Sequence, residues 1–600
     1  MYNTSEQRQR GFRQTETSYE SKIRKLLRLM ILTPEQEEIL EGKQGKTRQK
    51  AIRLLIDLGK AAKAERLVPV SSAHVSGVSP LTGGEGLIKF LEDLVSDSDG
   101  TAVIDTSLNS AGCDRNRFEE MDIPVKDYVE KQQKILDAYE KLGIKLSLSC
   151  TPYDNILSEG NASWAESNAV CFANSYSELR TNRESGLSAL ATSLSGFTPE
   201  YGLLLDENRC PNIKINVLCE LNEPVDYSIL GDWIGKQVSP EWKLDFGPIP
   251  HIFGIKELNF ESKKALTAAS ANYGSPLLFV DSFTTEPNLT KYQAEIDFKI
   301  NDLEKRYEEL APKTKVDLVT IGCPQASLEE IERTAELVKG RKIPDKRLWV
   351  FTSSLNFDKA NRKGFVKTIE DAGGMVLRET CPEVVHYNHQ KVNHILTNSM
   401  KAEHYLKSGL NSINTSVSRL SECIEYAENK EKITEKAIKE IKTKNKSLIS
   451  NKILKTGELE IEGKGLESQR EWEVSGEALV TDVPITFLGF VNRETGTIEE
   501  EGHPLDGISI ANKILIFPKG SGSTVAPYVL LGLFYNGNGP KAIINTDLDQ
   551  QTIPACSMLA VPYAHSFEKN PCIEINSGDK INIKLNDGKV SLKVVERNEH

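Results

Sequence analysis

The chain has 600 residues and a formal net charge of −12 at pH 7, with 39% hydrophobic and 27% charged residues. This length exceeds what one hydrophobic core normally fills, so we expect two or more domains. An acidic chain lacks the basic excess that nucleic acids and anionic membranes attract, and no run of about 18 apolar residues is present to span a bilayer. We therefore expect a globular protein that binds neither nucleic acid nor membrane.

The first 31 residues are polar and rich in arginine, and they contain no apolar core of a secretory signal. We interpret residues 1–31 as a surface extension. The ten cysteines include no close CxxC pair. Without an export signal, we expect them to be reduced thiols or metal ligands in a cytoplasmic protein.

The folded part is predicted to start at "LTPEQEEILEG", where Thr33 can cap a helix that has Pro34 in its first turn. Helical segments such as 327–340 and 362–374 then alternate with short apolar runs. The predicted buried strands are 101–109, 145–153, 212–221, 275–283, 315–324 and 347–354. This alternation indicates α/β units with mostly parallel sheets, whose sites gather at the carboxyl ends of strands.

Three cysteines, Cys150, Cys323 and Cys381, follow predicted strands and precede a proline within two residues. Three thiolates held in this way can bind a cubane iron–sulfur cluster and leave one iron open as a Lewis acid. The alternative is that they are small buried hydrophobic residues. Cys210 in "NRCPN" also precedes proline, so the Cys-Pro pattern alone is weak evidence.

Two further segments carry polar groups that could form a site. Cys381, His386, His389 and His394 lie within fourteen residues and could bind zinc, or the histidines could simply lie on the surface. The segment 161–190 is dense in Asn, Ser, Glu and Arg. It is either a solvated face or a site for an anionic substrate, in which Arg180 or Arg183 would supply paired donors.

The stretch "FPKGSGSTVAPYVLLGLF" joins a predicted strand to an apolar helix through a glycine-rich turn. Backbone N–H groups of such a turn attract an anion. Ser523 would lie near the helix start, where a developing alkoxide is stabilised, so it could act as a base without a histidine. The alternative is an ordinary strand–turn–helix connection.

The composition of the sequence changes after residue 420. Residues 421–455 are charged and rich in lysine, as in a linker or solvated helix, and residues 456–600 contain short β-rich runs. We therefore expect a second, smaller domain at 456–600.

Taken together, these segments resemble the aconitase X family over nearly the whole chain. The large-subunit pattern is carried by "LTPEQEEILEGKQG", "ERLVPVSSAHVSGVS", "SCTPY", "SWAESNAV", "IGCPQASLEE", "ETCP" and "TNSMKAEHY", and the small-subunit pattern by "GHPLDGISIANKILIFPKGSGST". The resemblance implies an α/β fold, with an aconitase-like multi-lobed large domain at 32–420 and a C-terminal swivelling β/α domain at 456–600. Because both parts are fused, no separate small subunit is expected.

The resemblance also implies a set of site residues. Cys150, Cys323 and Cys381 would hold an iron–sulfur cluster, 4Fe–4S in the active form. Ser523 would abstract a proton, and Glu166 would act as an acid or orient the leaving group. The implied substrate contacts are Gly77, Val78, Ser79, Asn109, Ser110, Ser167 and Lys401.

The implied activity is the dehydration of a small 3-hydroxy acid, namely (R)-5-phosphomevalonate to trans-anhydromevalonate 5-phosphate. The alternatives are a cis-3-hydroxy-L-proline dehydratase and an inactive homologue that serves as a binding protein. Three departures from the family pattern bear on the substrate: Gln325 replaces the usual histidine of Gly-Cys-Pro-His, Cys113 stands where methionine is common, and Asn109-Ser110 replaces Asn-Pro. A phosphate group would need a cationic pocket, for which Lys401 is the clear candidate.

Overall fold

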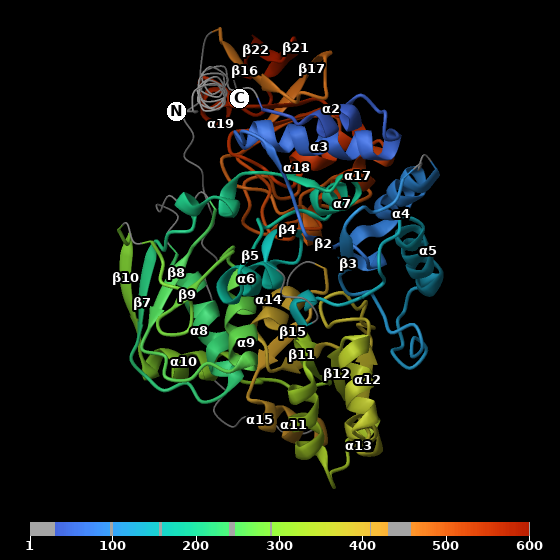
Figure 1. Ribbon diagram of the computed structural model, residues 1–600, viewed down its shortest axis with the longest axis vertical. Coiled ribbons are helices and arrows are strands. Elements are labelled where there is room, and N and C mark those ends of the chain that lie inside the picture. Colours follow the sequence, from blue (N-terminus) through green and yellow to red (C-terminus); the bar gives the residue numbers. More distant parts are fainter. Residues whose placement is uncertain are drawn as a thin grey trace, which may run out of the picture.

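The computed structural model describes residues 30–96, 100–154, 159–238, 246–288, 291–407, 410–429 and 458–598. They form three α/β lobes and a C-terminal domain built around a closed barrel (Figure 1). The predicted α/β class with a separate C-terminal domain is confirmed. Among the described helices, none is long and apolar enough to cross a membrane. The predicted N-terminal extension and lysine-rich linker fall almost entirely outside the described residues.

The first lobe contains a sheet in the order β3-β2-β4-β5, whose pairs are all parallel. The predicted helix start is confirmed, because Thr33 accepts a hydrogen bond from the Gln36 N–H and the Gln36 side chain caps the Thr33 N–H in return. The elements of this lobe are α2 (Pro34–Leu40), α3 (Lys46–Ala61), β1 (Leu67–Pro69), β2 (Ser72–Val75), α4 (Pro80–Ser96), β3 (Asp105–Leu108), α5 (Tyr128–Lys141), β4 (Gly160–Trp164), α6 (Ser167–Tyr176), β5 (Leu179–Arg180), α7 (Gly186–Ser195) and β6 (Phe197–Pro199).

The second and third lobes also have parallel sheets, in the orders β10-β7-β8-β9 and β13-β12-β11-β14-β15. The second lobe consists of β7 (Ile213–Val217), α8 (Pro224–Gln237), β8 (Pro250–Phe253), α9 (Phe260–Ala271), β9 (Phe279–Val280), β10 (Ala294–Phe298) and α10 (Ile300–Leu310). The third consists of β11 (Leu318–Ala326), α11 (Leu328–Val338), β12 (Leu348–Thr352), α12 (Ser354–Arg362), α13 (Phe365–Asp371), β13 (Met375–Arg378), β14 (His394–Thr397), α14 (Met400–Lys407), β15 (Asn414–Val417) and α15 (Leu420–Glu428). Helix α15 packs into the core of the third lobe and so extends it past the expected boundary at residue 420.

Two strand predictions next to the cysteines are wrong in detail. The described stretch 145–153 contains no named strand; it makes one isolated bridge, between Lys145 and Ser107, and ends in a 3₁₀ turn at Pro152–Asp154. Leu148 has a φ of +46°, which interrupts the extended backbone just before Cys150. Cys323 lies inside β11, not beyond its end, at the point where the ladder with β12 shifts register.

The C-terminal domain closes a barrel in the order β16-β20-β19-β18-β17-β21-β22. The four strands β17 to β20 pair in parallel and are joined by helices. The pairs that involve β16, β21 and β22 are antiparallel. The elements are β16 (Glu460–Gly465), β17 (Glu471–Val480), α16 (Phe487–Phe490), β18 (Ile514–Phe517), α17 (Ala526–Tyr535), β19 (Ala542–Asn545), α18 (Thr552–Leu559), β20 (Tyr563–His565), α19 (Pro571–Glu574), β21 (Lys580–Asn586) and β22 (Lys589–Glu596).

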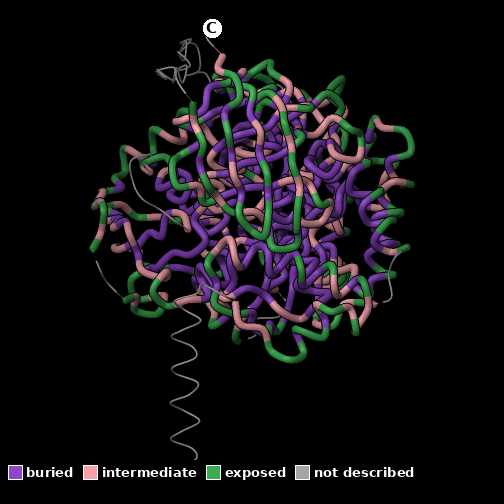
Figure 2. The backbone as a smooth tube through the Cα atoms, turned by 90° about the horizontal axis from the view of Figure 1, so that it is seen from above, coloured by how far each residue is buried: buried purple, intermediate pink, exposed green. Residues whose placement is uncertain are grey.

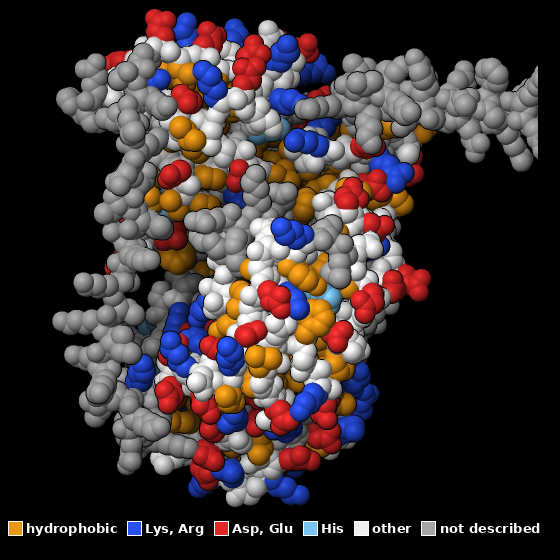
Figure 3. All heavy atoms as spheres, turned by 90° about the vertical axis from the view of Figure 1, so that its left-hand side faces the viewer, with side chains coloured by type: hydrophobic (Ala, Val, Ile, Leu, Met, Phe, Trp, Pro, Cys, Tyr) orange, Lys and Arg blue, Asp and Glu red, His pale blue; other side chains and the backbone are white. Residues whose placement is uncertain are grey.

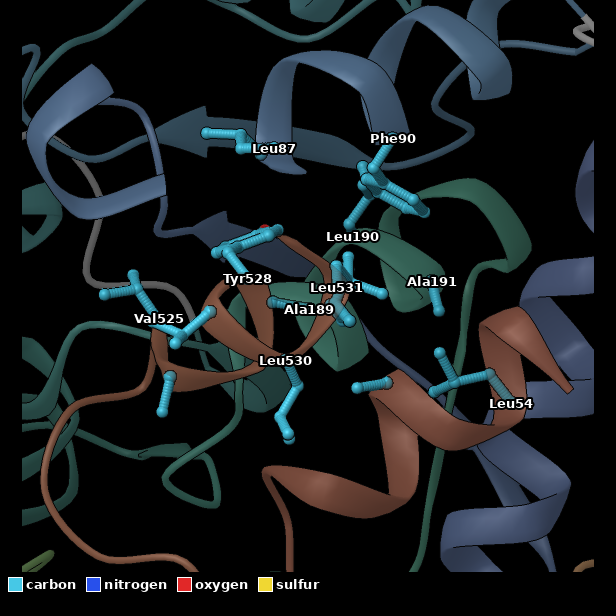
Figure 4. Packing of buried hydrophobic residues seen from close by; sticks show 14 of the residues in the cluster. Leu54, Leu87, Phe90, Ala189, Leu190, Ala191, Val525, Tyr528, Leu530 and Leu531 are labelled. Atoms are coloured by element: carbon cyan, nitrogen blue, oxygen red, sulfur yellow. The ribbon is translucent and has the colours of Figure 1, made fainter. Parts of the chain in front are cut away.

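One hydrophobic core joins the first lobe to the C-terminal domain. Leu87, Phe90 and Leu190 of the first lobe pack with Tyr528 and Leu531 of α17 (Figure 4). In Figure 2 the buried, purple segments fill the interior, and exposed, green segments lie at the rim and on the near face. The C-terminal domain is therefore docked on the first lobe through a continuous apolar interface.

A glycine contact sets the spacing of this interface. A Cβ atom on Gly86 of α4 would lie 2.4 Å from the Gly532 Cα atom of α17. We expect Gly86→Ala to push the two helices apart and to destabilise the protein by about 2 kcal/mol, a cost typical of overpacking. Urea unfolding should show this loss, whereas Gly100→Ala should change little because its Cβ would meet no atom closer than 3.8 Å. Equal unfolding midpoints for the two variants would contradict the assigned contact.

The surface mixes both signs of charge. On the face shown in Figure 3, Lys and Arg side chains lie among Asp and Glu side chains over the lower lobes.

Candidate active site

A cavity of about 120 Å³ lies between the first lobe, the third lobe and the C-terminal domain. Eight of the predicted site residues line it: Gly77, Val78, Asn109, Ser110, Glu166, Ser167, Lys401 and Ser523. They come from segments more than 400 residues apart in the chain. The cavity is thus assembled by both domains.

The loop between β2 and α4 forms one wall of the cavity, and Tyr528 of α17 packs against it. Gly77 has a φ of +91°, and a Cβ atom there would lie 2.1 Å from the ring of Tyr528. The Tyr528 hydroxyl donates to the Ser76 carbonyl at 3.1 Å. Ser79 is fully buried and donates to the Val384 carbonyl at 3.1 Å, so it supports the wall and does not line the cavity. Its direct contact with substrate stays a prediction.

In the wall of the cavity, a buried lysine lies between two carboxylates. The Lys401 Nζ lies 2.9 Å from Glu166 Oε1 and 3.3 Å from Glu383 Oε1, and its side chain is 4% exposed. Glu166 also accepts a hydrogen bond of 2.7 Å from Asn109. The hydroxyl of Ser110 is buried and has no hydrogen-bond partner in the described structure, although Ser110 lines the cavity. Such a group is suited to a polar ligand.

The two carboxylates have opposite pKa shifts. Burial alone would raise the pKa of Glu166, but the charge of Lys401 and the hydrogen bonds from Lys401 and Asn109 hold that pKa below its ordinary value. Burial raises the pKa of Glu383; Lys401 opposes this rise, and the charge of Glu166 adds to it. The lowered pKa of Glu166 favours its ionised form beside Lys401.

The three predicted cysteine ligands are buried beside this charged group. The Cys323 thiol donates to Glu383 Oε1 at 3.0 Å. Burial raises the pKa of all three thiols, to about 12 for Cys150, and Lys401 lowers it in each case. The charge of Cys381 raises the pKa of Cys323, and the charge of Cys150 raises that of Cys381. The three sulfurs thus share one electrostatic environment.

This donor set fits an iron–sulfur cluster in its chemistry, because soft thiolates in a buried pocket are the usual ligands of such clusters. Among the described residues, no group of three or more His, Cys, Asp and Glu side chains is placed to hold a single metal ion. Ligands on three different irons lie farther apart than ligands on one ion. The zinc alternative has no support here, since both ring nitrogens of His394 already contact oxygen atoms of Thr314, Lys315 and Ser416.

The glycine-rich turn places Ser523 at the cavity, two residues before the cap of α17. The Val525 N–H donates to the Ser523 Oγ at 3.4 Å. The N–H groups of Gly520 and Ser521 are used by Asp549 and by the Ile485 carbonyl. The backbone N–H groups of this turn were expected to stabilise a negative charge on the Ser523 oxygen. Those of Gly520 and Ser521 are already used by other acceptors, and the Val525 N–H is a donor that the sequence did not indicate.

Only one of the two candidate arginines lies near this site. Arg180 forms an ion pair with Asp206. Arg183 donates to the Ser167 hydroxyl at 2.8 Å and to the Gly522 carbonyl at 2.9 Å, so it ties the first lobe to the serine turn.

Comparison with known proteins agrees with this architecture. The family models for the aconitase X first, third and swivel domains match residues 29–207, 316–429 and 466–592. The phosphomevalonate dehydratase large subunit of Methanosarcina mazei is 35% identical over 387 residues, which cover 63% of this chain and 92% of that protein. The chain belongs to the aconitase X family. The cis-3-hydroxy-L-proline dehydratase of Pseudomonas aeruginosa is 29% identical over 415 residues, covering 65% of this chain and 69% of that protein.

This aconitase X protein combines two regions that are separate chains in some relatives. The phosphomevalonate dehydratase small subunit of Methanosarcina acetivorans is 38% identical over 117 residues, covering 20% of this chain and 81% of that protein. The crystal structure of Thermococcus kodakaraensis aconitase X in its holo-form superposes with a TM-score of 0.60 at 34% identity, covering 66% of this chain and all of that one. The predicted fusion is thus confirmed, and like those relatives this chain is a dehydratase of the hydro-lyase class.

Gln325, where the sequence departs from the family pattern, connects the segments that carry the cysteines. Its side chain accepts a hydrogen bond of 3.2 Å from the Cys150 N–H. Its amide nitrogen lies 2.9 Å from the Thr380 carbonyl, 3.2 Å from that of Thr352 and 3.3 Å from that of Leu148. The replacement of histidine therefore leaves a fully bonded group.

We expect Gln325→Leu to lower the free energy of unfolding by about 3 kcal/mol. The leucine side chain cannot form hydrogen bonds, so the buried backbone groups to which the Gln325 amide is hydrogen-bonded would lose their partner. Urea unfolding of the protein without added iron measures this cost. Gln133→Leu is the matched control, since the side chain of Gln133 is exposed and donates to Asp137 on its own helix. We expect a change within about 0.5 kcal/mol. A Gln325→Leu variant as stable as the control would contradict the connecting role.

Proposed function

We propose that this protein is an iron–sulfur hydro-lyase that converts (R)-5-phosphomevalonate to trans-anhydromevalonate 5-phosphate. The observation that carries this proposal is the meeting of Ser523 from the C-terminal domain with the Glu166–Lys401–Glu383 group, which lies beside the three buried cysteines. The substrate is supported by the large-subunit relative, which is more similar to this chain than the hydroxyproline dehydratase is, at 35% against 29% identity.

Ser523 acts as the base in this proposal. Its Oγ takes a proton from the carbon next to the substrate carboxylate, and the electron pair of that C–H bond forms the new double bond. The C–O bond on the adjacent carbon breaks, and its electron pair leaves with the hydroxyl as hydroxide. That hydroxide and the proton taken by Ser523 together make up the water that is released. The Val525 N–H stabilises the developing charge on the serine oxygen. Arg183 fixes the turn through the Gly522 carbonyl, so the serine keeps its position relative to Ser167.

Glu166 orients the substrate in this proposal and does not donate a proton, because its lowered pKa keeps it ionised. Lys401 neutralises it and supplies a cation toward an anionic substrate. Cys150, Cys323 and Cys381 would hold the cluster. When bound, the cluster supplies a Lewis acid for the leaving hydroxyl.

The test is an assay of water loss with protein reconstituted anaerobically with iron and sulfide. We expect turnover of (R)-5-phosphomevalonate and far slower turnover of cis-3-hydroxy-L-proline. Preferential turnover of the proline derivative would replace the substrate but keep the reaction class. No turnover of either compound by protein that contains stoichiometric iron would contradict the proposed activity and revive a binding role.

A further inference from the structure

A second cavity, of about 430 Å³, adjoins the first at the serine turn. The two cavities share Gly522 and Thr524 in their walls. The second is bounded by the first lobe, by the 272–276 segment of the second lobe and by the 519–524 turn of the C-terminal domain. Its volume falls in the usual range for small-molecule sites. Of the candidate residues from the sequence, Arg183 lines it, whereas none of the site residues implied by the family resemblance does.

Two cations line this second cavity without a carboxylate partner. Lys519 has no ion pair or side-chain hydrogen bond in the described structure. Arg183 uses its Nε and one terminal nitrogen for neutral oxygen acceptors, and its Nη1 has no hydrogen bond to a described residue. Most buried or half-buried cations are paired, so two unpaired ones in a single cavity indicate an anionic ligand.

The backbone of the turn adds donors. The N–H groups of Gly522, Ser523 and Thr524 make no hydrogen bond within the described structure, although the neighbouring N–H groups of Gly520 and Ser521 do. Gly522 has a φ of +81°, a left-handed conformation that glycine adopts without cost. Consecutive free N–H groups beside cations are typical of oxyanion sites.

The acidic groups of the same cavity are already satisfied. Asp549 is buried and accepts hydrogen bonds from the N–H groups of Gly520, Gln551 and Thr552. Glu184 is buried, accepts from Ser188 at 2.7 Å, and has its pKa raised by burial to about 7. Neither carboxylate forms an ion pair with Arg183 or Lys519 in the described structure, so the two cations stay available.

We propose that this second cavity binds a phosphate-type oxyanion through Lys519, Arg183 and the free N–H groups of the 522–524 turn. The oxyanion is either the far end of the substrate or a free anion that acts on the neighbouring serine turn. The substrate version rests on the proposed function; the oxyanion site itself does not.

The test is calorimetric titration of inorganic phosphate into the full-length protein without substrate. We expect saturable binding to the wild type and an affinity about tenfold lower in Lys519→Ala, because one charged hydrogen bond is lost. Lys513→Ala is the matched control in the same domain, since Lys513 pairs with Glu477 at 2.6 Å, and it should bind like the wild type. Absence of binding to the wild type, or equal affinity in the two variants, would overturn the proposal.

Kinetics of the Lys519→Ala variant then identify the source of the oxyanion. If the substrate provides it, KM for the phosphorylated acid rises about tenfold with kcat unchanged, while the unphosphorylated acid is unaffected. If a free anion provides it, KM is unchanged and the effect of added phosphate on the wild-type rate disappears in the variant. Calorimetry still decides the site if the protein shows no dehydratase activity.

Discussion

Ser523→Ala is expected to reduce turnover by about 10³-fold while leaving iron content and fold intact, in line with the usual contribution of a positioned base. The physical reason is that the serine Oγ lies at the cavity and accepts a hydrogen bond from the Val525 N–H, which can stabilise a developing charge on that oxygen. Removing it takes away the proton acceptor, whereas the cysteines and the Glu166–Lys401 pair lie on the other domain and are untouched. The rate of the dehydration assay and the iron content measure both parts of the prediction.

The matched control for the serine is two residues away. Ser521 lies in the same turn, but its hydroxyl contacts Thr486 at 2.7 Å and does not line the first cavity. Ser521→Ala should therefore retain the rate within a few-fold. Full activity in Ser523→Ala, or an equal loss in both variants, would contradict the role of Ser523 as the base.

Cys323→Ser is expected to lose the bound iron and the visible absorption of the cluster. A serine hydroxyl fits the same space and can still donate to Glu383, so the fold should survive, but an alcohol binds iron far less well than a thiolate. Iron and sulfide per chain after anaerobic reconstitution measure the effect, with far-ultraviolet circular dichroism as the check on folding.

Cys210 provides the control for the cysteines. It precedes a proline as Cys323 and Cys381 do, but it is partly exposed, whereas the three predicted ligands are buried. Cys210→Ser should bind as much iron as the wild type. A Cys323→Ser variant with an unchanged visible spectrum would exclude Cys323 from the ligand set.

The serine turn shows what local sequence can predict. The run of small residues between the strand at 514–517 and an apolar helix indicated both the turn and the position of Ser523 near the helix start, because these depend on neighbours in the chain. The stretch before Cys150 shows the limit. Its apolar residues predicted a strand, yet Leu148 adopts a positive φ, and its carbonyl accepts a hydrogen bond from the distant Gln325 side chain.

Other parts of the site had no local signal. Glu383 and Tyr528 gain their roles from segments far away in the chain: Glu383 from Lys401 and Cys323, and Tyr528 from Ser76. No periodicity in one segment encodes such pairings. The resemblance to a family supplied the cysteine set, and the fold then placed those thiols in one buried environment.

The account depends on a single spatial claim, that the three cysteines hold a cluster facing Ser523. The most direct measurement is the anomalous diffraction of crystals grown anaerobically from reconstituted protein, recorded at the iron absorption edge. The account predicts one compact iron peak bonded to the sulfurs of Cys150, Cys323 and Cys381 and open toward the cavity of Ser523. Iron bound elsewhere, or bound without one of these sulfurs, would contradict it.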